Sequence, residues 1–247
     1  MARAPAILAF DTSTSTAVVA VGRGARLLAV QHGPAPRAYD EGLVPRIVAA
    51  LAEADMEPGD LDAVACGRGP GSFTGLRIAL ATAKGYAFAL DRPLVLVGST
   101  EAIALGAPRG VRATVVVLDA KRGELFAQAF AFRAGAPSGR REAREVARVV
   151  LAAAALPAWI AGRRLPAPLA IVGEAVAQLA PLAEGFPDNV TIADAAFPPG
   201  GRLLELARRE FLARRFADVD AAEPDYIRPP PFNRPREFHR GARGSRG

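Results

Sequence analysis

The chain has 247 residues, and 51% of them are hydrophobic, which is enough to bury one large core or two small ones. The formal net charge of +6 comes from 31 basic and 25 acidic residues, but residues 228–247 alone hold six arginines and one glutamate, or +5. The rest of the chain is therefore close to neutral, which argues against a broad nucleic-acid-binding face.

The cysteine content and the hydropathy indicate a compartment. Cys66 is the only cysteine, so no disulfide can form within the chain. No apolar run reaches the roughly eighteen residues of a membrane span, and the N-terminus lacks the charged and apolar regions of a signal peptide. We therefore expect a protein of the reducing cytoplasm without membrane contact.

The first segments of the chain are predicted to be strands. Apolar runs at residues 6–10, 16–21 and 27–31 predict an antiparallel meander. Between the first two strands lies Asp-Thr-Ser-Thr-Ser, which begins at Asp11. Such residues form ordinary turns, and this interpretation is favoured; the alternative is a phosphate or Mg²⁺ site that uses Asp11 and Thr12.

A helix and a further strand follow the meander. Residues 42–54 place Leu43, Ile47 and Leu51 on one face at helical spacing. An apolar run at residues 61–66 then predicts a strand.

The stretch at residues 67–77, Gly-Arg-Gly-Pro-Gly-Ser-Phe-Thr-Gly-Leu-Arg, predicts a tight turn that opens a helix. Pro70 fixes one φ, and Ser72 is the expected N-cap. Backbone N–H groups at such a turn suit a phosphate, a carboxylate or a partner's carbonyl. Four glycines in this stretch permit positive φ and close approach of another backbone segment. They are Gly67, Gly69, Gly71 and Gly75.

This turn departs from the known phosphate-binding and nucleophile motifs. Leu76 and Arg77 stand where a Walker loop has Lys-Ser/Thr, and Thr74 stands where the dinucleotide fingerprint has glycine or alanine. Pro70 and Thr74 also replace the glycines of a hydrolase elbow around Ser72. A tight connection without a ligand and an anion site therefore remain equally open.

The helix that follows is apolar nearly all round, and after Arg77 its only charge is Lys84. Such a helix needs cover on two sides, either from a second domain or from a partner's helix, and the partner is favoured. Replacing Leu80 or Ala83 by arginine is then expected to leave the fold intact and to block pairing. Its apolar stripe comprises Phe73, Leu76, Leu80, Ala83, Ala87 and Leu90.

The second half repeats the plan of the first. After a strand at 94–97 and a short helix at 100–105, residues 115–127 again read as strand, aspartate, polar turn and strand, and Asp119 lies 108 residues after Asp11 (119 less 11). Strand, Gly-Glu turn and helix-like segment recur at residues 169–182. These matches indicate a duplicated domain.

The repeat sets the expected domain boundaries. The first domain covers residues 1–107 and is completed by a closing helix at 201–217, and the second, smaller domain covers 108–200. Residues 228–247 form a basic Pro/Arg/Gly-rich tail that cannot build a core.

Two such domains resemble the α/β architecture of actin, hexokinase and Hsp70 (ASKHA, RNase H-like), in which nucleotide lies between the halves. Asp11, Thr12 and Asp119 are then the candidate nucleotide ligands. Four stretches make the match closer, because together they resemble the TsaB (YeaZ) family in the family's order: residues 7–13, 67–77, 119–126 and 222–228.

The resemblance implies a non-catalytic scaffold subunit of the bacterial complex that adds threonylcarbamoyl to N6 of adenosine 37 in tRNAs reading codons that start with A. It implies pairing with a TsaD-type catalytic subunit, a TsaE-type ATPase in a larger complex, and indirect contact with tRNA. The chain itself would require no cofactor, and ATP or ADP would lie in or near the partner interface. Alone, the chain would form a homodimer through the same surface.

The resemblance also points to the partner-binding residues. They lie on the first-domain helices and comprise Leu43, Ile47, Leu51, Phe73, Leu76, Arg77, Leu80, Ala83, Lys84 and Ala87. Tyr39 stands where members of the family often have a histidine, which leaves any role of that imidazole open.

Two enzyme hypotheses remain as alternatives. An ATP-dependent phosphotransferase or ATPase of the same fold would use Asp11 and Asp119, although the first hairpin has no glycine or lysine. A peptidase would need a base beside Ser72, and spacing assigns none. The only histidines, His32 and His239, cannot form a His-x-x-x-His metal site.

Overall fold

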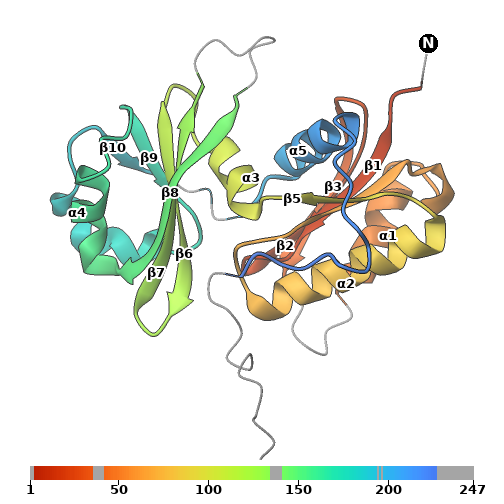
Figure 1. Ribbon diagram of the computed structural model, residues 1–247, viewed down its shortest axis with the longest axis horizontal. Helices are drawn as coiled ribbons and strands as arrows, with labels where there is room; N and C mark the ends of the chain where they lie inside the picture. Colours follow the sequence, from red (N-terminus) through yellow and green to blue (C-terminus); the bar gives the residue numbers. More distant parts are fainter. Residues whose placement is uncertain (1–2, 36–41, 134–140, 194, 196, 227–247) are drawn as a thin grey trace, which may run out of the picture.

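The computed structural model describes residues 3–35, 42–133, 141–193, 195 and 197–226. Within them the chain forms two α/β domains that lie next to each other along the longest axis, with helix α3 (Ser99–Leu105) between them (Figure 1). Tyr39 and the tail at 228–247 lie outside the described residues.

The first sheet is the predicted meander extended by two parallel strands. Strands β1 (Ala6–Asp11), β2 (Thr16–Arg23) and β3 (Arg26–Pro34) are antiparallel. Strand β4 (Ala63–Gly67) pairs parallel with β1, and β5 (Leu94–Val97) pairs parallel with β4, so the order is β3-β2-β1-β4-β5. All residues of β1 are buried, because helices cover both faces of the sheet.

The helices of the first domain divide between the two faces of this sheet (Figure 1). Helices α1 (Leu43–Glu53) and α2 (Phe73–Leu90) pack on one face, and α3 and α5 (Gly200–Leu212) pack on the other. The closing helix expected at 201–217 ends at Leu212, which is five residues early. Residues 213–226 continue along α2, and we call this segment the strap. A short 3-10 turn, η1 (Pro58–Asp60), precedes β4.

The second sheet has the same strand order as the first. It contains β6 (Ala113–Lys121), β7 (Glu124–Phe132), β8 (Ala143–Ala152), β9 (Leu169–Val172) and β10 (Val190–Ile192) in the order β10-β9-β6-β7-β8. In both sheets the first strand is central, with its antiparallel hairpin partner on one side and a parallel strand on the other. The duplication expected from the sequence is thus confirmed in the topology.

The helices of the second domain are shorter than those of the first. A 3-10 turn, η3 (Ala153–Ala155), leads into α4 (Leu156–Ala161), and a 3-10 helix, η4 (Val176–Gly185), follows β9. The helix expected at 175–182 is therefore not an α-helix, and Pro181 within it has no N–H for an α-helical hydrogen bond.

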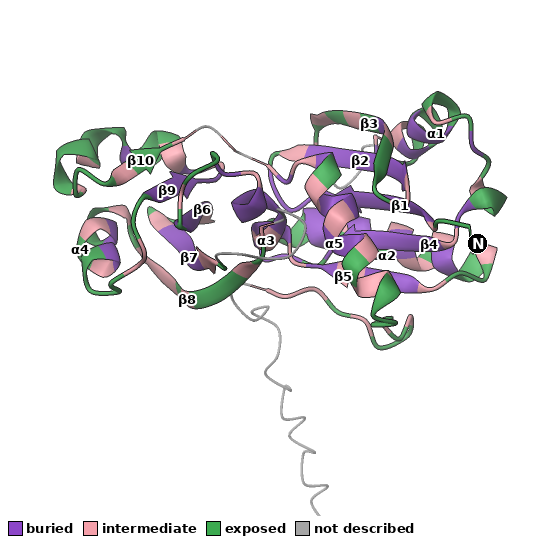
Figure 2. Cartoon of the chain, turned by 90° about the horizontal axis from the view of Figure 1, so that it is seen from above, coloured by how far each residue is buried: buried purple, intermediate pink, exposed green. Residues whose placement is uncertain are grey.

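Helix α3 is shared by the two domains. Ala102 and Leu105 pack against the first sheet, whereas Ile103 and Ala104 pack against the second. Buried residues run through the central strands of both sheets, and exposed residues line β8 (Figure 2). None of the described helices combines the length and apolar composition needed to cross a bilayer.

Candidate functional site

The glycine turn between β4 and α2 is built against the β1–β2 hairpin. A Cβ at Gly67 would overlap the Asp11 carboxylate, and a Cβ at Gly75 would overlap the carbonyl oxygen of Thr12. Neither glycine has a positive φ in the structure. These two positions therefore need glycine because another backbone lies so close.

Hydrogen bonds lock the hairpin to the turn. The Thr12 hydroxyl donates to the Gly75 carbonyl at 2.6 Å, and the Ser72 N–H donates to the Ser13 carbonyl at 2.7 Å. Ser72 also accepts from the Gly75 N–H at 3.2 Å, so the predicted N-cap is confirmed. The hairpin thus occupies the space in front of the turn, where an anion would have to lie.

Asp11 is fully buried under this turn. One carboxylate oxygen accepts from the Ser13 N–H at 2.7 Å, and the other accepts from the Ser99 hydroxyl. The Ser99 oxygen in turn accepts from the Gly69 N–H at 3.0 Å. Burial raises the pKa of the Asp11 carboxyl, and hydrogen bonds from Ser13 and Ser99 oppose that rise. Ser99 was not singled out in the sequence.

Asp119, the counterpart of Asp11, has a different environment. Its carboxylate pairs with the Lys121 ammonium at 2.7 Å and also accepts from the Lys121 N–H, and these interactions lower the Asp119 pKa. Its side chain is 30% exposed. Among the described residues no side chain hydrogen-bonds to both aspartates.

The strap at residues 213–226 closes over the outer side of the turn. The Asp225 N–H donates to the Arg68 carbonyl at 2.7 Å, and its carboxylate accepts from Arg148 of the second domain at 3.2 Å. A Cβ at Gly69 would meet the Asp225 carbonyl oxygen, and Gly69 itself has φ +105°. Asp225 lies in the last stretch of the family resemblance, which was the signal that could have identified this contact.

The groups proposed for a peptidase are not assembled. Ser72 serves as a helix cap, His32 stacks on Phe197 with ring centroids 6.0 Å apart, and the Lys84 ammonium donates to the Asp220 carbonyl. Within the described part of the chain, none of these groups hydrogen-bonds to Ser72 as a base. That part also contains no cluster of three or more His, Cys, Asp or Glu residues able to hold a metal.

Burial corrects the choice of partner-binding side chains. The apolar stripes of α1 and α2 face the chain's own first sheet, because the apolar face of a helix covers the nearest sheet. Arginine at Leu80 or Ala83 would therefore enter the core, and the expectation that such variants keep the fold is wrong. The buried members of the predicted set are Leu43, Ile47, Leu51, Leu76, Leu80, Ala83 and Ala87.

The three remaining predicted residues contact the strap. The Arg77 guanidinium lies 3.7 Å above the Phe73 ring, and its Nε donates to the Tyr226 hydroxyl at 3.0 Å. The Phe73 and Tyr226 rings lie 5.1 Å apart, and Lys84 bonds to Asp220. Phe73 is nevertheless 38% exposed, so this end of α2 is only partly covered.

A different set of apolar residues is exposed on the same two helices. A groove of about 360 Å³ runs between α1 and α2. On the same two helices, Val48 is 58% exposed and Phe88 is 84% exposed. The spacing of Val44 and Val48 and the small residues of α2 were the available signals. We call this set the α1–α2 face: Val44, Val48, Thr82, Gly85, Tyr86, Phe88, Ala89 and Leu90.

Comparison with known proteins places the chain in a family. A family model described as TsaD: tRNA N6-adenosine threonylcarbamoyltransferase matches residues 33–226. A Haemophilus influenzae protein named tRNA threonylcarbamoyladenosine biosynthesis protein TsaB is 30% identical over 226 residues, which are 90% of this chain and 93% of the relative.

Other relatives match over a shorter span. An uncharacterized Mycobacterium tuberculosis protein is 39% identical over 122 residues, which are 49% of this chain and 56% of the relative. Matches to several relatives, including the Bacillus subtilis and Escherichia coli TsaB proteins, span only 34–56% of the relative's length.

Solved structures agree with the sequence matches. A Pseudomonas aeruginosa protein described as uncharacterized, with similarity to peptidase YeaZ, has a TM-score of 0.73 at 26% identity, covering 91% of this chain and 100% of that chain. Component A of Acidaminococcus fermentans (R)-2-hydroxyglutaryl-CoA dehydratase has a TM-score of 0.51 at 9% identity, covering 85% and 99%, and shows the shared fold alone.

Two domains with the same strand order form the actin, hexokinase and Hsp70-like architecture that the sequence led us to expect. The near full-length match to a TsaB protein and the structural match to YeaZ confirm the resemblance read from the four sequence stretches. The chain belongs to the TsaB (YeaZ) family of tRNA threonylcarbamoyladenosine biosynthesis proteins.

Proposed function

We propose that this chain is a scaffold subunit without chemistry of its own, which pairs with a TsaD-type catalytic subunit through the α1–α2 face. The complex would add threonylcarbamoyl to N6 of adenosine 37 in tRNAs that read codons starting with A. A TsaE-type ATPase would join the larger complex in the cytoplasm, and through the α1–α2 face this chain would contact tRNA only indirectly.

The observation that carries the proposal is the exposed apolar groove between α1 and α2. Val44, Tyr86 and Leu90 line this groove, and two further large apolar side chains of the same helices are exposed, Val48 at 58% and Phe88 at 84%. Such a face is an association site, because burying it against a partner removes apolar surface from water. Gly85 and Ala89 lie one turn apart on α2, so a partner's helix could approach its backbone closely.

The enclosed Asp11 favours this role over the phosphotransferase alternative. A phosphotransferase needs its carboxylates within reach of Mg²⁺ and nucleotide. Asp11 is fully buried, and both of its carboxylate oxygens accept hydrogen bonds from this chain. We therefore propose that the chain requires no cofactor for this role, and that the ATP or ADP of the modification reaction belongs in or near the partner interface.

The same reasoning predicts self-association of the isolated chain. With no catalytic partner present, the α1–α2 face would be covered by a second copy. Sedimentation equilibrium over a range of concentrations should then show a dimer, and monomer alone at the highest concentration would contradict this part of the proposal.

Reconstitution of the modification reaction tests the function. Unmodified tRNA, threonine, bicarbonate, ATP and the other components are incubated with and without this chain, and threonylcarbamoyladenosine is measured in the tRNA. We expect product only when the chain is present, and no turnover of ATP by the chain alone. Equal product without the chain contradicts the scaffold role. ATP hydrolysis by the chain alone that is lost in Asp11→Asn would favour the ATPase alternative.

A further inference from the structure

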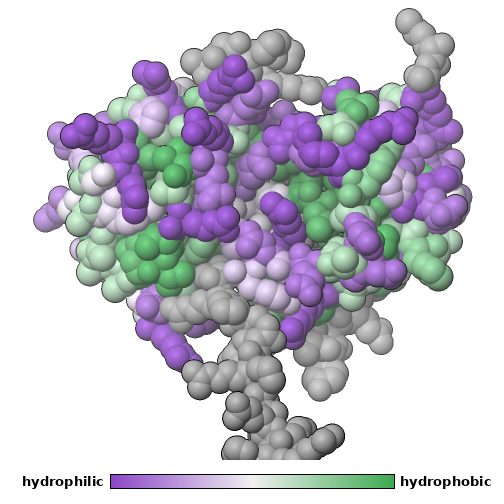
Figure 3. Space-filling model, in the orientation of Figure 1, coloured by the Kyte–Doolittle hydropathy of each residue, from purple (hydrophilic) through white to green (hydrophobic). Residues whose placement is uncertain are grey.

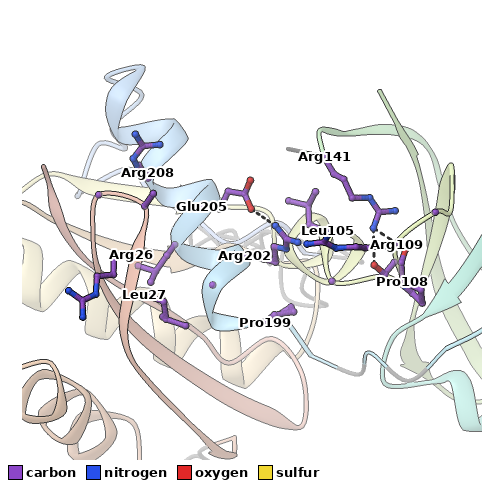
Figure 4. A pocket seen from close by; sticks show the side chains of 17 residues that line it. Arg26, Leu27, Leu105, Pro108, Arg109, Arg141, Pro199, Arg202, Glu205 and Arg208 are labelled. Carbon is purple, nitrogen blue, oxygen red and sulfur yellow. Dashed lines mark hydrogen bonds and ion pairs between the residues drawn. The ribbon is translucent and has the colours of Figure 1, made fainter. Parts of the chain in front are cut away.

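A large cavity lies on the face of the first sheet opposite to the α1–α2 face. Its volume is about 910 Å³, and it is formed by the β2–β3 turn, the C-terminal end of α3, the start of α5 and Arg141 (Figure 4). Hydrophilic residues gather over α5 on this side of the molecule (Figure 3). We call it the arginine cavity, because its lining includes Arg26, Arg109, Arg141, Arg202 and Arg208.

Three of these arginines lie on one side of the arginine cavity. Figure 4 shows the Arg109 side chain extending toward that of Arg202, while the Arg141 guanidinium is turned toward the Pro108 carbonyl. Burial lowers the pKa of the Arg141 guanidinium, and the charges of Arg202 and Arg109 lower it further. Among the described residues Glu205 is the single carboxylate that lines this cavity, and it pairs with Arg202 at 2.6 Å. The cluster therefore keeps an excess of positive charge.

The three arginines differ in how they are held. Arg141 donates to the carbonyls of Ala107, Pro108 and Val111, which fixes its position. Arg109 has no acidic partner among the described residues. Arg109 is therefore free to bind an anion, whereas Arg141 is part of the wall.

The start of α5 adds to the same positive potential. Its N-cap is Pro199, which offers no side-chain hydrogen bond, and its first turn contains no acidic residue. Arg202 stands in that turn, although the N-terminal end of a helix dipole disfavours a cation. An anion between Arg202 and the helix start would interact favourably with both. Gly201 lines the arginine cavity, and a Cβ there would meet open space.

The opposite part of the lining combines apolar side chains with Arg26 and Arg208 (Figure 4). Leu27, Leu204 and Pro199 belong to the wall, and Leu27 is 45% exposed. A cationic side next to an apolar wall matches a molecule that carries a phosphate next to a flat, weakly polar ring.

We propose that the arginine cavity binds a nucleotide unit, with its phosphates at Arg109, Arg202 and the start of α5 and its base against the wall of Leu27 and Leu204. The unit is either a free nucleotide or one nucleotide of an RNA strand, which share this chemistry. The site lies on the far side of the first sheet from the α1–α2 face and does not depend on the pairing proposed above.

Titration of the full-length chain tests the proposal and separates the two sources. ADP, inorganic pyrophosphate and an unmodified tRNA transcript are titrated in turn, by calorimetry for the small anions and by fluorescence anisotropy for the tRNA. Saturable binding of ADP, stronger than that of pyrophosphate, supports a free-nucleotide site with a contribution from the base. Binding of tRNA alone supports a nucleotide of an RNA strand, provided that the variants below weaken it. Binding of none of the three overturns the proposal.

Matched variants tie the binding to the arginine cavity. Arg109→Gln should weaken binding roughly tenfold or more, as expected for the loss of a charge-assisted hydrogen bond. Gly201→Asp should abolish binding, because its carboxylate would occupy the anion position, whereas Gly201→Ala should leave affinity unchanged. Arg163→Gln, an exposed arginine beside α4 in the second domain, is the charge-matched control. If Arg109→Gln and Gly201→Asp bind as tightly as the Arg163→Gln control, the site is elsewhere and the proposal is wrong.

Discussion

The two faces of α2 differ in what covers them, although both are rich in small apolar residues. Ala79, Leu80 and Ala83 pack against the first sheet, and none of them is more than 7% exposed. On the other face Gly85 and Phe88 are exposed, and Phe88 reaches 84%. The regular apolar stripe is therefore the part that holds the domain together, and the irregular small residues are the part that stays exposed.

The largest expected effect comes from placing a charge on the buried face. Leu80→Arg should destabilise the protein by about 4 kcal/mol or more, because a guanidinium without a partner would enter the core. Urea unfolding followed by circular dichroism measures the change. Ala81→Arg, on the exposed side of the same helix, is the control and should shift stability by less than about 0.5 kcal/mol. Equal stability of the two variants would mean that the buried and exposed faces are wrongly assigned.

Two glycine-to-alanine substitutions in α2 test the difference between its two faces with the smallest change of side chain. A Cβ at Gly75 would overlap the Thr12 carbonyl, so Gly75→Ala should cost about 2–3 kcal/mol. A Cβ at Gly85 meets nothing within 4 Å, so Gly85→Ala should stabilise the protein by about 0.5–1 kcal/mol through helix propensity. Thermal unfolding of both variants checks the opposite signs, and a stabilised Gly75→Ala would show that the hairpin does not press on the turn.

The pH dependence of stability probes the carboxylate under the start of α2. The pKa of Asp11 is raised above its ordinary value of 3.8, so the folded state retains a proton that the unfolded state has released. The contribution of Asp11 should thus fall as pH rises from about 3.8 through the raised value. Asp11→Asn should remove this part of the slope in urea unfolding measured at about pH 4 to 8.

Asp119→Asn is the matched control in the second domain. The pKa of Asp119 is lowered by Lys121, so its contribution has the opposite sign and is lost only as pH falls through that lowered value. The pair is largely exposed, so the change should stay within about 0.5 kcal/mol. A slope that is unchanged in Asp11→Asn would show that Asp11 is not the group that titrates.

The fold was largely predictable because its signals are local. Short apolar runs and the aspartate-turn repeat identified all strands of the first sheet and β6, β7 and β9 of the second, but not β8 or β10. The glycine turn identified the start of α2. The segment at 175–182 failed because its apolar pattern suits an α-helix, while Pro181 and tertiary contacts favour a 3-10 helix. Periodicity alone does not distinguish these two.

The proposed partner-binding face was less predictable, because its position depends on which side of α1 and α2 packs against the first sheet. Leu43 and Leu80 were chosen for regular spacing, but regular spacing marks the face that the chain covers itself. A contact distant in sequence, such as that of Ser99 with Asp11, leaves no pattern in a single sequence. The exposed face of α1 and α2 can be identified only when their buried face is known.

Pairing through the exposed face is the central claim, and Gly85→Arg tests it most directly. Sedimentation velocity with a purified TsaD-type subunit compares the wild-type chain, Gly85→Ala and Gly85→Arg, with unfolding measured in parallel. We predict that Gly85→Arg keeps its fold, because the position is open, but fails to pair, because a long cation replaces close apolar contact, while Gly85→Ala pairs like the wild type. A folded Gly85→Arg variant that pairs as tightly as Gly85→Ala would contradict the account.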